Sequence, residues 1–143
     1  MPVTFSYADA KLPFVGKAAL KRAVAELFIA EGCVLQQLDY VFCTDVFLIN
    51  INRQFLQHDD YTDIITFNLT EAGLDNGIVG EVYISVERVK DNAAKHGQVF
   101  SSEVLRVVFH GALHLCGYND KRKDDKEVMR RKEDFYIQQY LNG

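Results

Sequence analysis

Two histidines four residues apart, His110 and His114, are the side chains whose types and spacing most clearly indicate chemistry. Residues four apart lie on the same face of a helix, so both imidazoles point in one direction. Gly117 suits the left-handed backbone that ends a helix, and the chain can then turn back and bring Asp120 beneath the two rings. Two imidazole nitrogens and one carboxylate oxygen suit a tetrahedral Zn²⁺ whose fourth position holds water. Such a site makes hydroxide near neutral pH, so the motif predicts a metal-dependent hydrolase.

The surroundings of the two histidines favour metal ligation over a structural role. Residues 104–115 are apolar apart from Arg106 and the histidines themselves, so we expect this helix to be largely buried. Burial disfavours a charged imidazole, and each ring must satisfy two nitrogens. A lone histidine there is explained by a bond to a neighbour, but two on one face are better explained by a shared metal ion. The other histidines, His58 and His96, lie among polar residues, and we interpret them as exposed.

Length and composition bound the class of protein. The chain has 143 residues, of which 48% are hydrophobic and 25% charged, so we expect a single globular domain spanning residues 1–143. No apolar run approaches the roughly 20 residues that cross a bilayer. The N-terminal residues have neither a basic start nor a long apolar core, which argues against a secretory signal. We therefore expect a cytoplasmic protein with no membrane partner. The three cysteines form no C-x-x-C pair, which argues against a cysteine zinc site.

The charge is unevenly distributed. A net charge of −4 argues against broad, nonspecific nucleic-acid binding. Residues 121–132 nevertheless contain seven basic and three acidic side chains, directly after the metal motif. Two interpretations stay open for this segment: a solvated helix face, or a rim that contacts phosphates.

Alternation and helical periodicity predict a mixed α+β fold. Four strands are expected, at residues 3–7, 38–43, 62–67 and 80–85. Five helices are expected, at residues 16–31, 45–56, 86–96, 102–116 and 124–141. Thr44 and Ser101 are the expected N-caps of the second and fourth helices, and Gly73, Asp75, Asn76 and Gly77 mark a loop. The order predicts a small mixed four-stranded sheet with about five helices packed over it.

The motif resembles that of a known family. Residues 110–120 read HGALHLCGYND, and the metal-dependent endoribonucleases of the YbeY family carry H-G-x-L-H-L-x-G-Y-D-H; nine of the eleven positions agree, counting the free ones. Residues 62–67, TDIITF, resemble the family block Thr-Asp-Val-Leu-Ser-Phe, and residues 80–85, GEVYIS, resemble Gly-Asp-Ile-x-Ile-Ser. The blocks occur in the family's order, so the chain is identified as a member.

The resemblance implies both a fold and a function. It implies a four-stranded sheet with helices and a zinc ion between the histidine helix and the turn after it. It also implies single-strand-specific RNA cleavage in ribosomal RNA maturation, especially at the 3′ end of 16S rRNA, and in ribosome quality control. The implied partners are ribosomal RNA and the small ribosomal subunit or one of its proteins. An acidic chain guided to RNA by a protein partner is consistent with the net charge.

The resemblance also assigns residues, with two departures. His110 and His114 match the first two family ligands, and Asp120 stands where the third is normally a histidine. The carboxylate keeps a Zn²⁺ site but makes a weaker Lewis acid, and it also suits Mn²⁺ or other harder ions. The family's arginine, counted back from the second block, falls on Leu56. Arg53, one helical turn earlier, could place its guanidinium on a phosphate oxygen or simply be an exposed helix residue.

The residues leave some mechanistic alternatives open. Gly111 stands where zinc peptidases of the H-E-x-x-H type carry their glutamate, which argues against a small zinc peptidase. The glycine instead leaves open space beside the metal, which could admit a phosphate or let helices approach closely. Either a metal-bound water or the ribose 2′-hydroxyl could attack phosphorus, with Arg53 stabilising the charge. We expect loss of His114 to abolish both metal binding and cleavage. A non-catalytic ribosome-binding module with a structural metal is the remaining alternative.

Overall fold

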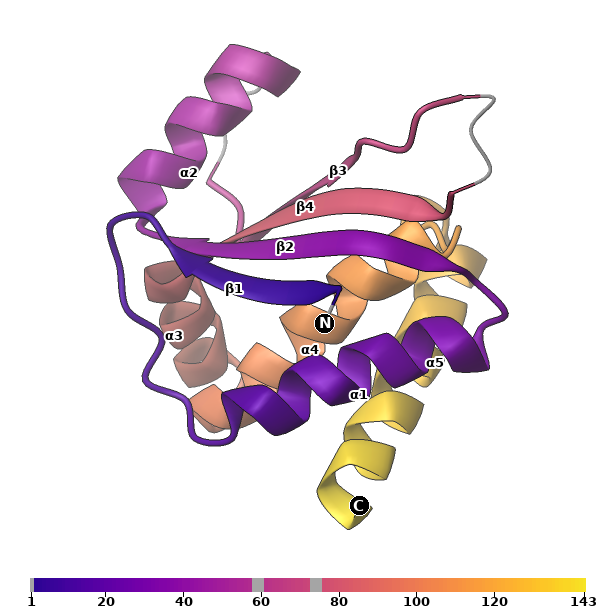
Figure 1. Cartoon of the computed structure of the whole chain (residues 1–143). Helices are drawn as coiled ribbons and strands as arrows, with labels where there is room; N and C mark the ends of the chain where they lie inside the picture. Colours follow the sequence, from indigo (N-terminus) through magenta and orange to yellow (C-terminus); the bar gives the residue numbers. More distant parts are fainter. Residues whose placement is uncertain (1, 58–60, 73–75) are drawn as a thin grey trace.

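Two parallel strands, β2 (Leu35–Cys43) and β4 (Ile78–Ser85), form the centre of a four-stranded sheet (Figure 1). The strand β1 (Val3–Tyr7) adds in parallel to β2, and β3 (Ile64–Asn68) pairs antiparallel with β4. The resulting order is β1-β2-β4-β3. This computed structural model describes residues 2–57, 61–72 and 76–143. His58, interpreted above as exposed, and Gly73 and Asp75, expected in a loop, lie outside the described residues.

Helices cover the sheet unequally on its two faces. Figure 1 shows four of them on one face: α1 (Lys17–Ala30), α3 (Val86–Lys95), α4 (Phe100–Leu115) and α5 (Lys123–Asn142). On the other face stands α2 (Asp45–Ile51), which continues as the π-helical turn η1 (Asn52–Leu56). The expected α+β architecture, a mixed four-stranded sheet with five α-helices, is confirmed for the described residues. No helix within the described ranges is sufficiently long and apolar to span a membrane.

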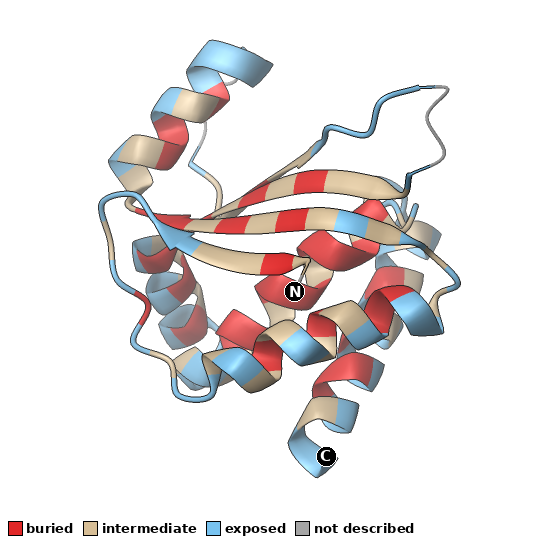
Figure 2. Ribbon diagram, viewed as in Figure 1, coloured by how far each residue is buried: buried red, intermediate tan, exposed pale blue. Residues whose placement is uncertain are grey.

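The main core lies between the sheet and the helices on its lower face, where the buried residues gather in Figure 2. Alternate residues of β2 point into it, namely Leu38, Tyr40 and Phe42, as the period of two in a strand requires. The Tyr40 hydroxyl satisfies its buried donor by bonding the backbone oxygen of Val108 at 2.7 Å. This places α4 at the centre of the helical layer, and most of its residues are buried.

Glycines allow α4 to lie unusually close to the sheet. A Cβ atom on Gly111 would come within 3.0 Å of Val82 and 3.2 Å of Ile64. A Cβ atom on Gly80 would meet Leu115 at 2.6 Å. Neither role expected for Gly111 is what the structure shows: the glycine packs α4 against the sheet, not against another helix, and Val82 and Ile64 leave no open space at its position. The histidine face of α4 is thereby fixed relative to β3 and β4.

The expected element boundaries are wrong at several places. The fourth helix begins at Phe100 with Val99 as its N-cap, not with Ser101, because Phe100 packs onto the core and extends the helix. Pairing between Leu35 and Ile78 starts β2 and β4 earlier than alternation alone indicated. Thr44 is confirmed as an N-cap, since its hydroxyl accepts from the Phe47 amide at 3.3 Å.

Candidate metal centre

The two motif histidines point toward the same space from the last turns of α4. Their ring centroids lie 4.8 Å apart at an interplanar angle of 82°. The helix ends as expected at Gly117, whose φ of +103° is in the left-handed region. The Gly117 amide bonds the oxygen of His114 at 3.0 Å, and the Tyr118 amide bonds the oxygen of Leu113 at 3.1 Å. This closed turn reverses the chain and carries Asp120 back toward the imidazoles.

The side chains of His110, His114 and Asp120 form one group that could hold a metal ion. Asp120 lies 3.2 Å from His110 Nε2 through Oδ2 and 3.5 Å from His114 Nε2 through Oδ1. One ligand atom from each of these residues lies within 4.8 Å of the other two. Zn²⁺ bonds of about 2.0–2.1 Å at tetrahedral angles separate ligand atoms by about 3.3 Å. The residues present therefore fit the ion in their chemistry, and one oxygen of Asp120 lies near the tetrahedral separation from each imidazole nitrogen.

A buried carboxylate on α5 orients the first histidine. Glu133 Oε2 lies 2.7 Å from His110 Nδ1, and its side chain is only 7% exposed. With the Nδ1 proton bonded to Glu133, the Nε2 lone pair faces the proposed ion, as in carboxylate–histidine–zinc arrangements. Burial opposes protonation of His110, but the hydrogen bond and charge of Glu133 outweigh it and raise the pKa of His110. The carboxylates around His110 thus favour a positive charge on its ring, and the same charges would favour a cation bound at Nε2.

Arg106 fixes the other oxygen of this carboxylate. Its guanidinium donates to Glu133 Oε1 at 2.8 Å and to Asp134 Oδ1 at 2.7 Å. Both pairs join α4 to α5, and the first leaves the other Glu133 oxygen to contact His110. Charge-assisted hydrogen bonds from one guanidinium to two carboxylates restrict the positions of all three side chains.

The donor set opens on a cavity of about 570 Å³ between α4 and β3. Its wall includes two further carboxylates, Asp63 at the start of β3 and Glu103 in the first turn of α4. Burial raises the pKa of both groups, and the neighbouring charge of Asp63 raises that of Glu103 further. The volume suits a nucleotide-sized ligand. Three protein donors beside an accessible cavity are typical of catalytic rather than closed structural zinc sites.

Sequence reasoning found the three candidate ligands but not the residues that contact them. Glu103, Arg106, His110 and His114 are spaced three, four and four residues apart, which places all four on one face of α4 and on the cavity wall. That spacing was a usable signal. Glu133 left no such signal, because it reaches the site from another helix through tertiary packing.

Arg53 is not brought to this cavity. It is exposed on η1, on the far side of the sheet from α4, and it is not among the described residues that line the cavity (Figure 1). Leu56, at the position where the family usually has arginine, is exposed on the same turn. His96 is exposed at the end of α3, as expected.

Comparison with known proteins identifies the family. The family described as endoribonuclease YbeY matches residues 7–141. An endoribonuclease YbeY from Parabacteroides distasonis is 40% identical over 136 residues, covering 93% of this chain and 92% of the relative. One from Bacteroides thetaiotaomicron is 36% identical over 133 residues, covering 93% and 95%. The chain belongs to the YbeY endoribonuclease family.

The YbeY match encloses every residue of the cavity wall, since these residues fall between positions 62 and 133. A third YbeY relative, from Cytophaga hutchinsonii, is 50% identical over 104 residues, covering 73% of this chain and 71% of the relative. The solution structure of a Thermotoga maritima protein is similar in fold, with a TM-score of 0.65 and 26% identity over 96% of this chain and 89% of that one.

The zinc-peptidase alternative conflicts with the packing of this YbeY member. A peptidase would need a glutamate side chain at position 111, but that position is buried against Val82 and Ile64. A side chain there would require Val82 and Ile64 to shift by a few tenths of an ångström. Together with the absence of a glutamate at this position in the sequence, the tight packing argues against H-E-x-x-H chemistry.

Proposed function

We propose that this chain is a metal-dependent endoribonuclease that cleaves single-stranded RNA during ribosomal RNA maturation, including the 3′ end of 16S rRNA. His110, His114 and Asp120 hold one Zn²⁺. The observation that carries the proposal is the convergence of these three donors, whose ligand atoms lie within 4.8 Å of one another, at the wall of an accessible cavity. When bound, the ion supplies a Lewis acid that polarises a phosphoryl oxygen and lowers the pKa of water.

The remaining residues of the cavity prepare the site. Glu133 keeps His110 in the tautomer that presents Nε2, and Arg106 holds Glu133 in place. The carboxylate of Asp120 adds negative charge to the ligand set, which lowers Lewis acidity relative to three histidines and also suits Mn²⁺. Asp63 and Glu103 are the groups that can hold or release a proton within the cavity, because burial holds their pKa values above the usual range.

Arg53 stays a proposed phosphate contact. Because it stands on the opposite face of the sheet, it would bind RNA that has left the cavity rather than the reacting phosphate. The nucleophile is either water or the ribose 2′-hydroxyl, and the product ends distinguish the two. A 2′,3′-cyclic phosphate would identify the hydroxyl. We further propose that the small ribosomal subunit or one of its proteins brings the RNA to the enzyme, also in ribosome quality control, in the cytoplasm.

A cleavage assay with matched variants tests the proposal. Zinc-loaded protein is incubated with a single-stranded RNA oligonucleotide and with a precursor containing the 16S 3′ end, with and without chelator. We expect the chelator and His114→Ala to abolish cleavage, and His96→Ala, an exposed histidine outside the cavity, to leave it unchanged. Full cleavage by metal-free His114→Ala protein would defeat the proposal.

A further inference from the structure

A strip of cations leads away from the metal centre along α5. Lys123, Lys126, Arg130 and Arg131 recur at intervals of three, four and one residues, which places them on one side of the helix. We call these four residues the basic face of α5. All of them are exposed, and they line a shallow groove of about 580 Å³ in which Glu127 is the only acidic side chain among the lining residues.

The basic face is continuous with the metal centre. A second hollow, of about 250 Å³, is lined by Lys126 and Arg130 together with the ligands His110 and Asp120 and with Glu133. Lys126 and Arg130 therefore belong both to the groove and to the edge of the site. The charge of Arg130 also acts on Glu103 inside the main cavity, where it opposes the rise in the pKa of that carboxyl.

These cations are not engaged by the protein itself. In the described part of the chain, no carboxylate forms an ion pair with any residue of the basic face. By contrast, the neighbouring Lys132 binds Glu31, and Arg122 binds Asp124. The chain as a whole carries a net charge of −4, so four cations that form no ion pair with a described residue concentrate positive potential beside the site.

We propose that the basic face of α5 is the track on which the phosphates of single-stranded RNA lie as the strand enters or leaves the metal centre. This inference rests on the proposed function and extends it by assigning the path of the substrate. The helix rises about 1.5 Å per residue, so Lys123 to Arg131 offers roughly 12 Å of positive surface next to the scissile position. Of the two interpretations that the sequence left open, the structure favours phosphate contact.

The salt dependence of binding tests the track directly. Binding of a labelled 12-nucleotide oligouridylate is measured by fluorescence anisotropy in chelator, which prevents cleavage, from about 50 to 200 mM salt. The slope of log affinity against log salt is about −0.7 for each phosphate neutralised on a single strand. We expect the double variant Lys126→Glu/Arg130→Glu to bind at least tenfold more weakly at low salt, and its slope to be shallower by roughly 1.4.

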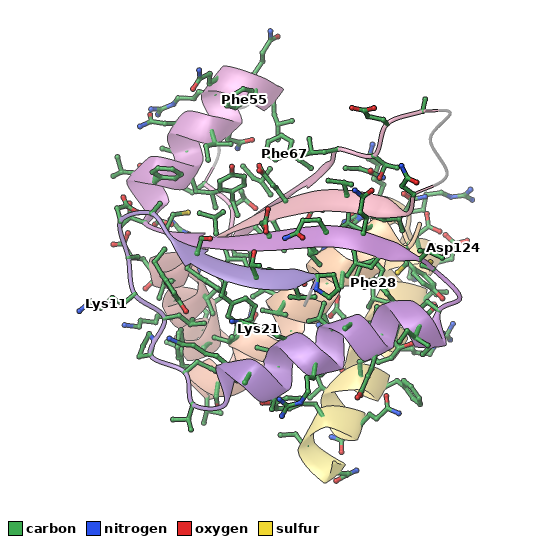
Figure 3. All side chains as sticks on the ribbon, in the orientation of Figure 1. Lys11, Lys21, Phe28, Phe55, Phe67 and Asp124 are labelled. Carbon is green, nitrogen blue, oxygen red and sulfur yellow. The ribbon has the colours of Figure 1, made fainter. Side chains whose placement is uncertain are left out.

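A matched double variant distinguishes the effect of the basic face on RNA affinity from the effect of net charge alone. Lys11→Glu/Lys95→Glu changes the charge by the same amount at exposed positions. Figure 3 shows Lys11 at the edge of the molecule opposite Asp124, which marks the start of α5. We expect this control to change affinity by less than about twofold. Equal losses in both variants, no loss in either, or wild-type binding to an acidic peptide but not to the oligouridylate would overturn the proposal.

Cleavage kinetics distinguish this inference from the proposed function. In the zinc-loaded enzyme, Lys126→Gln/Arg130→Gln should raise KM severalfold with little change in kcat, because both side chains lie outside the donor set. An unchanged KM alongside normal metal-dependent cleavage would refute the track and leave the activity standing. A different result would support the track and refute the activity. In that case the wild type binds RNA in a salt-dependent way but does not cleave it, and the Lys126→Glu/Arg130→Glu variant loses the binding.

Discussion

Glu31, at the end of α1, accepts a hydrogen bond of 2.6 Å from the hydroxyl of Tyr118, in the turn that carries Asp120 to the metal centre. The same carboxylate also accepts from Lys132 at 3.2 Å and from the Tyr136 hydroxyl, both on α5. One side chain therefore joins α1, the turn after the motif and α5. The position of Asp120, the proposed third ligand, thus depends on contacts far from the histidines in sequence.

Loss of the Tyr118 hydroxyl should destabilise the folded protein while leaving the packing of the ring in place. We expect Tyr118→Phe to lower the free energy of unfolding by about 1 kcal/mol, because Glu31 loses one of its donors. Urea denaturation at neutral pH measures the change. Tyr7→Phe is the control, since Tyr7 is partly exposed and its hydroxyl has no hydrogen bond to a described residue. Equal stability of the Tyr118→Phe and wild-type proteins would contradict the assignment.

Glu31 should make the free energy of unfolding fall as the pH is lowered. Burial opposes its ionisation, but hydrogen bonds from Tyr118, Tyr136 and Lys132 outweigh burial and hold the pKa of Glu31 below its usual 4.5. Its contribution is therefore complete above about pH 4.5 and is lost as the pH falls through the lower folded-state pKa. We expect Glu31→Gln to be less stable than the wild type at pH 7, and the difference to shrink toward pH 3. Urea denaturation across this range, with exposed Glu26→Gln as control, would show a pH-independent difference if this explanation is wrong.

Glu133 should tune metal affinity through His110. We expect Glu133→Ala to weaken zinc binding by roughly 10- to 100-fold, because His110 loses the acceptor that fixes its tautomer. Glu133→Gln keeps an acceptor oxygen and should have a smaller effect. Competition with a zinc chelator measures both variants. Asp134→Ala removes a contact to Arg106 but none to His110, so zinc affinity that falls equally in this control would show that the effect is merely structural.

Ionisation of Glu103 should lower the free energy of unfolding of the protein. Burial and the charge of Asp63 raise its pKa, so ionisation is unfavourable in the folded protein and stability falls as the pH rises through the usual carboxylate range. We expect Glu103→Gln to be more stable than the wild type at pH 7 by roughly 1 kcal/mol, with the advantage disappearing below pH 4. Thermal denaturation at the two pH values measures it. A less stable variant at neutral pH would mean that the protein favours the ionised carboxylate.

The parts of the fold and site that depend on local sequence pattern could be predicted. Spacing placed His110 and His114 on one face, and Gly117 marked the turn because few other residues adopt its backbone conformation without strain. Helix and strand order followed from periodicity. The start of α4 was wrong because burial of Phe100 overrides the capping preference of Ser101. The contacts of Glu31 and Glu133 could not be predicted, since they depend on how α1 and α5 pack against α4.

We propose that His110, His114 and Asp120 together hold one cation. A crystal grown with zinc and measured at the zinc absorption edge, beside a crystal of His114→Ala prepared identically, would locate the ion. We expect one anomalous peak at about 2.0–2.2 Å from His110 Nε2, His114 Nε2 and an Asp120 oxygen, and no such peak in the variant. Side chains that point apart in the presence of zinc, or an ion bound elsewhere, would contradict it.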